Sequence, residues 1–150
     1  MEQIIQNVKL EEEISSGCNK NDVWSVVSNF QNYPYIMDNV KCVTIENVDG
    51  KAYSTWDVDI DGAPITWKEV DNFDIENGLI QFEALEGDFF HFKGNWKIHE
   101  NDKIKVSFEA DYCLGVPQIE KVLGHIIREK LANNIKNMLK GISTEVGKNE

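Results

Sequence analysis

Hydrophobic and polar positions change their spacing twice along the chain and divide it into three parts. From residue 6 to residue 15 apolar positions alternate with polar ones, which predicts a half-buried strand. Valines and Phe30 follow at helical spacing over residues 23–30, after the Asn19–Asp22 cluster, which contains good helix N-caps. Tyr33-Pro34 interrupts this segment. We therefore predict one strand followed by two short helices.

From Val40 to Tyr112 the period is two, which is typical of strands. Short turn signals interrupt the pattern, including Asp49-Gly50, Asp61-Gly62 and Asn77-Gly78, and such dipeptides are strong hairpin signals. Loops this short pair sequential strands antiparallel. The pattern predicts a meander with strands at residues 40–48, 51–60, 63–74, 79–86, 89–99 and 103–112.

After Pro117 apolar residues recur every three or four positions from Ile119 to Ile142. This spacing predicts one helix of about 28 residues, roughly 42 Å long. An apolar stripe of this length needs a large concave partner, which the meander supplies when the first strand joins it as a seventh. The predicted fold class is α+β, with a curved seven-stranded antiparallel sheet wrapped around a long C-terminal helix in a single domain of residues 1–150.

The alternation also assigns an inner face of the sheet that is rich in aromatic rings. An apolar hollow with a few polar groups is the usual form of a small-molecule site, although any single ring there is equally well explained as core. The predicted ligand-contacting residues are Trp56, Trp67, Phe82, Phe90, Phe92, Trp96, Phe108 and Tyr112 on the sheet, and Leu123, Ile127 and Arg128 on the long helix.

Two side chains are candidates for catalysis. Glu69 shares the parity of Trp67 and would have its pKa raised in a ring-lined cavity, which suits a general base. Alternatively, a bulge after Trp67 turns Glu69 outward, or Glu69 pairs with a lysine. Tyr35 either offers a hydroxyl group at the mouth of the pocket or packs beneath the long helix.

The composition excludes several other classes. The net charge of −11 disfavours nucleic acid and anionic membrane surfaces as partners. The 3 cysteines form no CxxC pair and suit a reducing compartment, and no apolar run is long enough to span a membrane. The segment Asp57–Gly62 begins like a calcium loop, but Lys68 stands where a glutamate ligand is needed. We expect a cytoplasmic protein without stable membrane insertion, metal or cofactor.

The order of elements and several segments resemble the START-like (SRPBCC) superfamily, and within it the polyketide cyclase/dehydrase (aromatase/cyclase) branch. The resemblance implies a helix-grip fold and an aromatic-lined pocket for a hydrophobic or polyketide-like ligand. The segments that carry it are Val23–Val27 with Phe30 and Tyr33-Pro34, Trp67–Glu69, Gly87–Phe89, Gly94–Trp96, and Pro117 with Leu131, Asn134, Met138 and Leu139.

The resemblance supports two hypotheses. In the first, the protein is an enzyme that assists enolisation, aldol cyclisation or dehydration of a polyketide-type intermediate, which an acyl carrier protein could present, with Glu69 and Tyr35 as catalytic groups. In the second, it is a non-catalytic carrier of an aromatic or isoprenoid molecule, similar to the coenzyme Q-binding branch. Several ring-forming members carry a pocket arginine on the sheet, whereas the only arginine here is Arg128, on the predicted helix. The sequence is also compatible with a homodimer.

Overall fold

The order of elements along the chain is the predicted one. A computed structural model describes residues 5–15, 17–115 and 117–148, and side chains 117–122, including that of Ile119, lie outside the description. The elements are β1 (Gln6–Glu13), α1 (Lys20–Val27), the 3₁₀ turn η1 (Phe30–Asn32), α2 (Tyr33–Ile36), β2 (Val40–Val48), β3 (Lys51–Ile60), β4 (Ala63–Asp74), β5 (Leu79–Gly87), β6 (His91–Glu100), β7 (Ile104–Cys113) and α3 (Pro117–Gly147). The predicted strand bounds are correct at β2, β3 and β4 and differ by at most two residues elsewhere.

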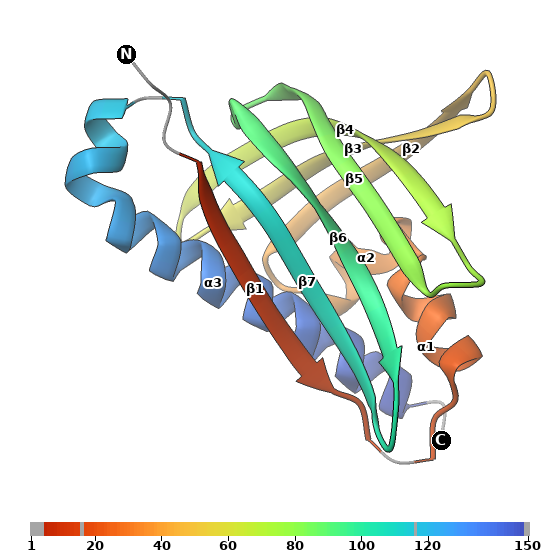
Figure 1. The fold of residues 1–150 in the computed structure, drawn as a ribbon. Coiled ribbons are helices and arrows are strands. Elements are labelled where there is room, and N and C mark those ends of the chain that lie inside the picture. Colours follow the sequence, from red (N-terminus) through yellow and green to blue (C-terminus); the bar gives the residue numbers. More distant parts are fainter. Residues whose placement is uncertain (1–4, 16, 116, 149–150) are drawn as a thin grey trace.

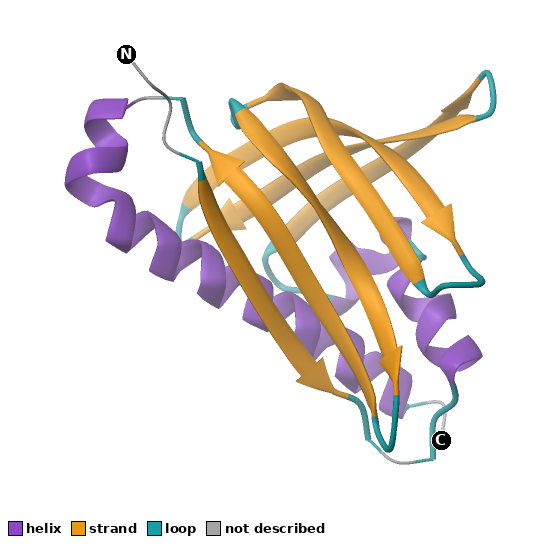
Figure 2. Ribbon diagram, in the orientation of Figure 1, coloured by secondary structure: helices purple, strands orange, loops and turns teal. Residues whose placement is uncertain are grey.

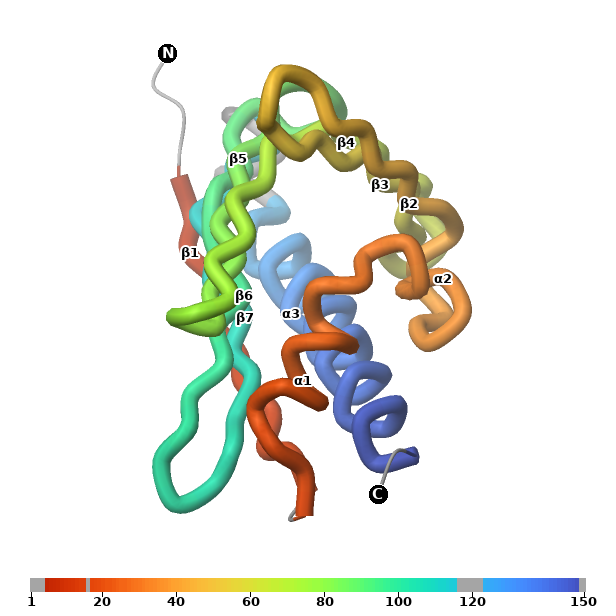
Figure 3. Tube along the Cα trace, turned by 90° about the vertical axis from the view of Figure 1, so that its right-hand side faces the viewer, coloured from red at the N-terminus to blue at the C-terminus, as the bar shows by residue number. Residues whose placement is uncertain are grey.

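The strands form one antiparallel sheet in the order β1-β7-β6-β5-β4-β3-β2 (Figures 1 and 2). The meander is thus extended by β1, which pairs with β7 from Gln6 opposite Tyr112 to Glu13 opposite Lys105. Figure 3 shows the sheet curled into an arch, with α3 running inside the curve and α1 and α2 beside it. This is the helix-grip arrangement that the sequence predicted.

The local signals act as their chemistry requires. Asp49-Gly50 and Asp61-Gly62 adopt positive φ at both residues, at 52° and 79° and at 55° and 91°, which is the type I′ geometry that tightens a two-residue hairpin. The side chain of Asn19 accepts a hydrogen bond from the backbone N–H of Asp22, and the side chain of Asp22 accepts one from the backbone N–H of Asn19, a capping box at the start of α1. These turns fix the register of the strands that they join, and the cap fixes where α1 begins.

The backbones of β6 and β7 approach each other closely at Gly94, in the middle of β6. A Cβ atom at this position would lie 1.9 Å from the backbone oxygen of Glu109 and 2.6 Å from the Cα atom of Ala110. Gly94 pairs with Ala110 on one side and with Phe82 on the other. Glycine and alanine therefore stand opposite each other where β6 and β7 come closest, and a larger side chain at Gly94 would force the two strands apart.

The two halves of α3 differ in packing. Leu131, Ile135 and Ile142, in the second half, are buried against the sheet and the short helices, whereas Leu123 and Ile126 are exposed. In Figure 1 the first turns of α3 project past β1. The second half of α3 therefore closes the core, and the first half leaves one end of it open. Among the described helices, none is long and apolar enough to cross a membrane.

Candidate functional site

The interior between the sheet and α3 is almost filled by aromatic rings. Trp56 and Trp67 stack in parallel, with ring centroids 5.6 Å apart, and a central hollow of about 30 Å³ remains beside them. That volume holds about one or two water molecules. The central hollow is lined by Trp56, Val58, Ile60, Trp67, Glu69, Phe82, Phe89, Phe92, Trp96, Phe108, Leu131, Asn134, Ile135 and Met138.

Glu69, on β4, is the titratable side chain in the wall of the central hollow. It is 2% exposed, and its Oε1 atom accepts a hydrogen bond of 2.7 Å from Trp67 Nε1. The sheet does contain a bulge here, because Lys68 pairs with Glu86 and Glu69 with Ala84. The extra residue, Leu85, lies on β5, so the alternation along β4 continues and Glu69 points inward. Within the described part of the chain, Glu69 has no lysine partner.

Asp71, two positions further along β4, is a second buried carboxyl group that the sequence analysis missed. It is 6% exposed, and its Oδ2 atom accepts a hydrogen bond of 2.5 Å from Ser54 Oγ. Ser54 in turn accepts a hydrogen bond of 2.8 Å from Trp56 Nε1. Asp71 and Glu69 lie on the same face of β4 beside Ser54, which pairs with Glu69 across β3 and β4 and donates to Asp71. The alternation that placed Glu69 inward applies equally to Asp71 and was the available signal.

The surroundings of the two carboxyl groups decide which one holds a proton. Burial raises the pKa of Glu69 well above its usual value, and the hydrogen bond and charge of Asp71 raise it further. Burial also raises the pKa of Asp71, but its hydrogen bonds with Glu69 and Ser54 act in the opposite direction. Of the two, Glu69 is therefore the carboxyl group that holds its proton to higher pH, and in its neutral form it can donate a hydrogen bond.

Tyr33, on α2, faces this pair from the helical side. It is fully buried, and its hydroxyl donates a hydrogen bond of 2.5 Å to the backbone oxygen of Val27. Its ring meets those of Phe30 and Trp56 edge to face. Burial raises the pKa of Tyr33 well above its usual value, with the charges of Glu69 and Asp71 adding to the rise. In the sequence Tyr33 stood out only as part of the Tyr33-Pro34 pair, which interrupts the helix and contributes to the family resemblance, and it was not among the predicted site residues.

A second space, the side hollow, lies beneath the first half of α3 and has a volume of about 160 Å³. Ile60, Phe89 and Leu131 line both hollows and so form the wall between them. A Cβ atom at Gly124 would meet nothing within 4 Å, in keeping with the open packing of this half of α3. The side hollow is lined by Ile60, Ala63, Ile65, Phe89, Tyr112, Leu114, Ile127, Lys130 and Leu131.

Most of the residues predicted to contact a ligand line one of these two hollows. The central hollow includes Trp56, Trp67, Phe82, Phe92, Trp96 and Phe108, and the side hollow includes Tyr112 and Ile127.

The structure corrects the placement of two predicted aromatic residues. Tyr35 is 85% exposed on α2 and lines neither hollow, since its neighbour Tyr33 takes the inward position. Phe90 is 65% exposed, and Phe89 lines both hollows instead. The prediction extended the parity of β6 back to residue 89, but β6 begins at His91 and the preceding residues form a bend, where strand alternation does not hold.

The same correction applies to two positions on the long helix. Leu123 is 42% exposed, Arg128 is exposed, and neither lines a hollow. The helical period assigned the correct stripe to the second half of α3, but it could not indicate that Leu123 and Ile126 in the first half are exposed. Because Arg128 is the only arginine in the chain, a cyclase mechanism that relies on a pocket arginine is excluded.

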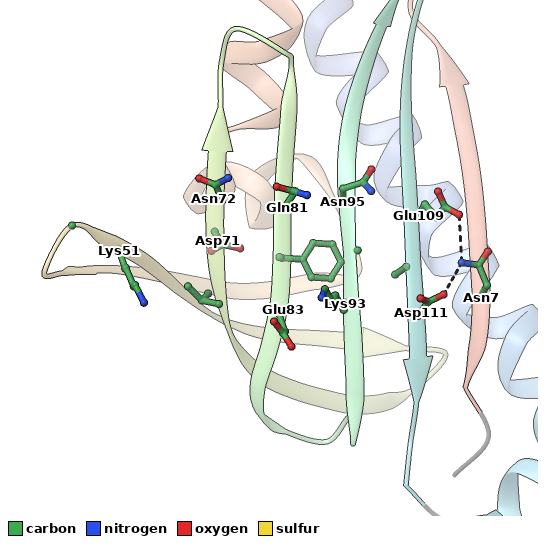
Figure 4. A pocket seen from close by; sticks show the side chains of 15 residues that line it. Asn7, Lys51, Asp71, Asn72, Gln81, Glu83, Lys93, Asn95, Glu109 and Asp111 are labelled. Carbon is green, nitrogen blue, oxygen red and sulfur yellow. Dashed lines mark hydrogen bonds between the residues drawn. The ribbon is translucent and has the colours of Figure 1, made fainter. Parts of the chain in front are cut away.

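A larger hollow of about 590 Å³ lies on the outer face of the sheet (Figure 4). Asn72, Gln81, Asn95 and Glu109 form a row across four paired strands, and Asn7 donates hydrogen bonds to Glu109 and, at 2.8 Å, to Asp111. These side chains are exposed or half-exposed. An open polar face of this kind is what one side of an antiparallel sheet presents to water, so the ring-lined interior is the better candidate site.

Comparisons with solved structures agree on the fold. A protein from Thermus thermophilus, TTHA0849, has a TM-score of 0.84 at 22% identity, covering 94% of this chain and 97% of its own. The Zhui aromatase/cyclase from Streptomyces sp. R1128 has a TM-score of 0.77 at 20% identity, covering 96% and 94%. A START superfamily protein from Mycobacterium smegmatis has a TM-score of 0.73 at 16% identity, covering 97% and 99%.

Among curated proteins, none matches this sequence. The sequence model of one family, described as polyketide cyclase / dehydrase and lipid transport, matches residues 19–139. That range contains the aromatic wall, the buried carboxyl pair and most of α3. The chain belongs to the polyketide cyclase / dehydrase and lipid transport family.

Proposed function

We propose that the protein binds a hydrophobic, carbonyl-bearing small molecule between its sheet and α3 and promotes enolisation, aldol cyclisation or dehydration by acid catalysis from Glu69. The observation that carries the proposal is a buried carboxyl group in the wall of a ring-lined hollow, where burial raises its pKa. General acid–base catalysis by a positioned side chain typically contributes 10²–10⁴-fold. The aromatic wall supplies the apolar contacts that orient a flat ligand.

Glu69 acts first as an acid in this proposal, whereas the sequence analysis expected a base. A carboxyl group whose pKa is raised well above its usual value begins the reaction protonated. It can donate that proton to a carbonyl or a leaving hydroxyl group, and the resulting carboxylate can then accept a proton from carbon. Acid chemistry of this kind takes the place of the arginine chemistry that the position of Arg128 excludes.

The sizes of the hollows bear on how a ligand reaches Glu69. The central and side hollows, at about 30 and 160 Å³, are together smaller than the ~300 Å³ at which typical ligand pockets begin. Binding therefore requires the wall formed by Ile60, Phe89 and Leu131 to move, which joins the two spaces, and also requires the joined space to expand. The loosely packed first half of α3 is the part of the enclosure that can move at least expense of buried contacts.

The test is turnover of short linear poly-β-ketones by the wild type and by Glu69→Gln. Product formation is followed by absorbance and mass spectrometry. The wild type should form ring products faster than buffer alone, and Glu69→Gln should lose about 10²–10⁴-fold in kcat while retaining ligand binding. Glu83→Gln, which alters an exposed carboxylate on the outer face, is the matched control. Full turnover by Glu69→Gln would remove Glu69 from the mechanism.

A second candidate function is a non-catalytic carrier of an aromatic or isoprenoid molecule. The observation that favours it is that the inward aromatic rings pack against one another, as in the stack of Phe89 on Phe92 with ring centroids 4.3 Å apart. Saturable binding without turnover by the wild type would favour the carrier. Presentation of the substrate by an acyl carrier protein, homodimer formation and a cytoplasmic location remain predictions.

A further inference from the structure

A line of buried polar side chains lies across β3 and β4, and hydrogen bonds run in from both ends toward Asp71 and Glu69. Trp56 Nε1 donates to Ser54 Oγ at 2.8 Å, and Ser54 Oγ donates to Asp71 Oδ2 at 2.5 Å. At the other end, Trp67 Nε1 donates to Glu69 Oε1 at 2.7 Å. An indole N–H can only donate, so both ends of the line have a fixed direction. Every donor in it points toward the junction of the two carboxyl groups.

This fixed direction determines how many protons the junction can hold. Without a proton, two buried carboxylates would lie two positions apart on the same face of β4, and neither forms an ion pair with a described lysine, arginine or histidine. With two protons, one hydroxyl group would lack an acceptor within the line. With one proton, the junction is a carboxylic acid bound to a carboxylate, the arrangement expected of two acids that cannot both ionise.

The free acceptor position lies on Asp71. Its Oδ1 atom is buried and receives no hydrogen bond from an N–H group or from Ser54. Ala52 and Phe82, the residues paired with Asp71 on β3 and β5, carry no acidic or basic group. Tyr33 is the titratable residue facing the pair from α2, and its hydroxyl donates to Val27 instead. The hydrogen of the Glu69 carboxyl group is thus the donor left for Asp71.

We propose that Glu69 and Asp71 share a single proton and work as one acid–base unit, in which Glu69 meets the substrate and Asp71 is the positioning residue that keeps the proton available. This inference rests on the proposed function for its substrate. Because the described lining of neither hollow contains an unpaired cation to hold a carboxylate, an uncharged substrate fits, and the β-hydroxy ketone of the proposed dehydration is uncharged.

The corresponding step balances without a cofactor. The proton shared by the pair passes to the β-hydroxyl oxygen of the substrate, the C–O bond breaks and water leaves. The α-carbon releases its proton to the Glu69 carboxylate, and the electron pair of that C–H bond forms the carbon–carbon double bond. The products are an unsaturated ketone and water, and the pair again holds one proton.

The test begins with the protein free of ligand. Carboxyl groups labelled with ¹³C are titrated by NMR in the wild type and in Asp71→Asn. The wild type should contain one carboxyl group that stays protonated at neutral pH. In Asp71→Asn the amide N–H replaces the shared proton as donor to Glu69 and one negative charge is lost, so the midpoint should move to lower pH by about one unit or more. Glu83→Gln, outside the pair, should leave the midpoint unchanged.

Ser54→Ala is a second variant that does not depend on how Asn packs at position 71. It removes one donor to Asp71, so Asp71 should become a stronger acceptor and the Glu69 midpoint should move to higher pH. Opposite shifts in Asp71→Asn and Ser54→Ala are the expected result. A wild type with no protonated carboxyl group at neutral pH, or an unchanged midpoint in both variants, would overturn the inference.

Turnover separates the inference from the proposed function. If the two are both correct, the pH profile of kcat in Asp71→Asn moves to lower pH with the NMR midpoint, while the ligand Kd is kept. If the wild type shows the protonated pair and binds ligand but turns over no poly-β-ketone, the proposed enzyme function fails and the shared proton stands. A Glu69-dependent turnover whose pH profile is the same in Asp71→Asn contradicts the inference alone.

Discussion

Replacing Glu69 by Gln should change how the stability of the protein depends on pH. In the wild type the folded state keeps a proton on Glu69 at pH values where the unfolded chain has lost it, because the folded pKa is raised well above 4.5. The folded state then binds more protons than the unfolded state, so the free energy of unfolding falls as pH rises. The glutamine side chain has no proton to lose, yet it can still donate to Asp71 and accept from Trp67.

The magnitude follows from the number of protons. One extra proton in the folded state gives a decrease of about 1.4 kcal/mol in the free energy of unfolding for each pH unit. The decrease runs from the unfolded pKa up to the folded pKa of Glu69. Glu13 and Asp74, whose pKa values are lowered, are ionised in both states above pH ~6. Tyr33 and Lys103, whose pKa values are raised, titrate only above pH ~10.

The assay is urea unfolding at half-unit steps between pH ~6 and ~8, followed by tryptophan fluorescence. The wild type and the Glu83→Gln control should lose stability with rising pH along the same slope. Glu69→Gln should show a slope smaller by about 1.4 kcal/mol per pH unit. Its free energy of unfolding should therefore rise relative to that of the wild type at each step toward higher pH. Parallel slopes for the wild type and Glu69→Gln would refute the claim that Glu69 is buried as a neutral acid.

Three further predictions test the surrounding structure. Gly94→Ala should lower the free energy of unfolding by about 3 kcal/mol, because its Cβ atom would lie 1.9 Å from the backbone oxygen of Glu109. A urea midpoint like that of the wild type would contradict the close approach of β6 and β7 at this position. Tyr35→Phe and Arg128→Gln, both at exposed positions, should change stability by less than about 0.5 kcal/mol and leave ligand Kd unaltered. Phe89→Ala should destabilise by about 3 kcal/mol and speed ligand association in stopped-flow fluorescence, whereas an unchanged rate would mean that Phe89 is no barrier.

The topology could be predicted because its signals are local. Asp49-Gly50 and Asp61-Gly62 set tight hairpins through their own backbone preferences, and the change of period after Pro117 separates sheet from helix. Parity along β4 placed Glu69 inward. The same parity applied to Asp71, but a lone inward aspartate has no evident partner in the sequence, since Ser54 and Trp56 come from the neighbouring strand.

The remaining errors occurred where long-range packing decides. Phe89 and Phe90 lie at a bend between β5 and β6, so strand alternation could not choose between them. The exposure of Leu123 and Arg128 depends on how α3 packs against the sheet, and helical periodicity alone carries no information about that packing. The wrong placement of Tyr35 has the same cause, because a helix as short as α2 turns only one of its two tyrosines inward and periodicity does not say which one. Residues at the ends of elements are thus the least predictable part of the site.

The most direct test of the account is a fluorescence titration of the protein with polycyclic aromatic ketones and quinones, in the wild type and in Glu69→Gln. Trp56, Trp67 and Trp96 line the central hollow, so a ligand that enters it must contact at least one indole. The account predicts saturable quenching with similar Kd in both proteins, because apolar contacts supply most of the affinity. The absence of a saturable response to every ligand in both proteins would contradict it, because the rings would then be core and the interior would not be a binding site.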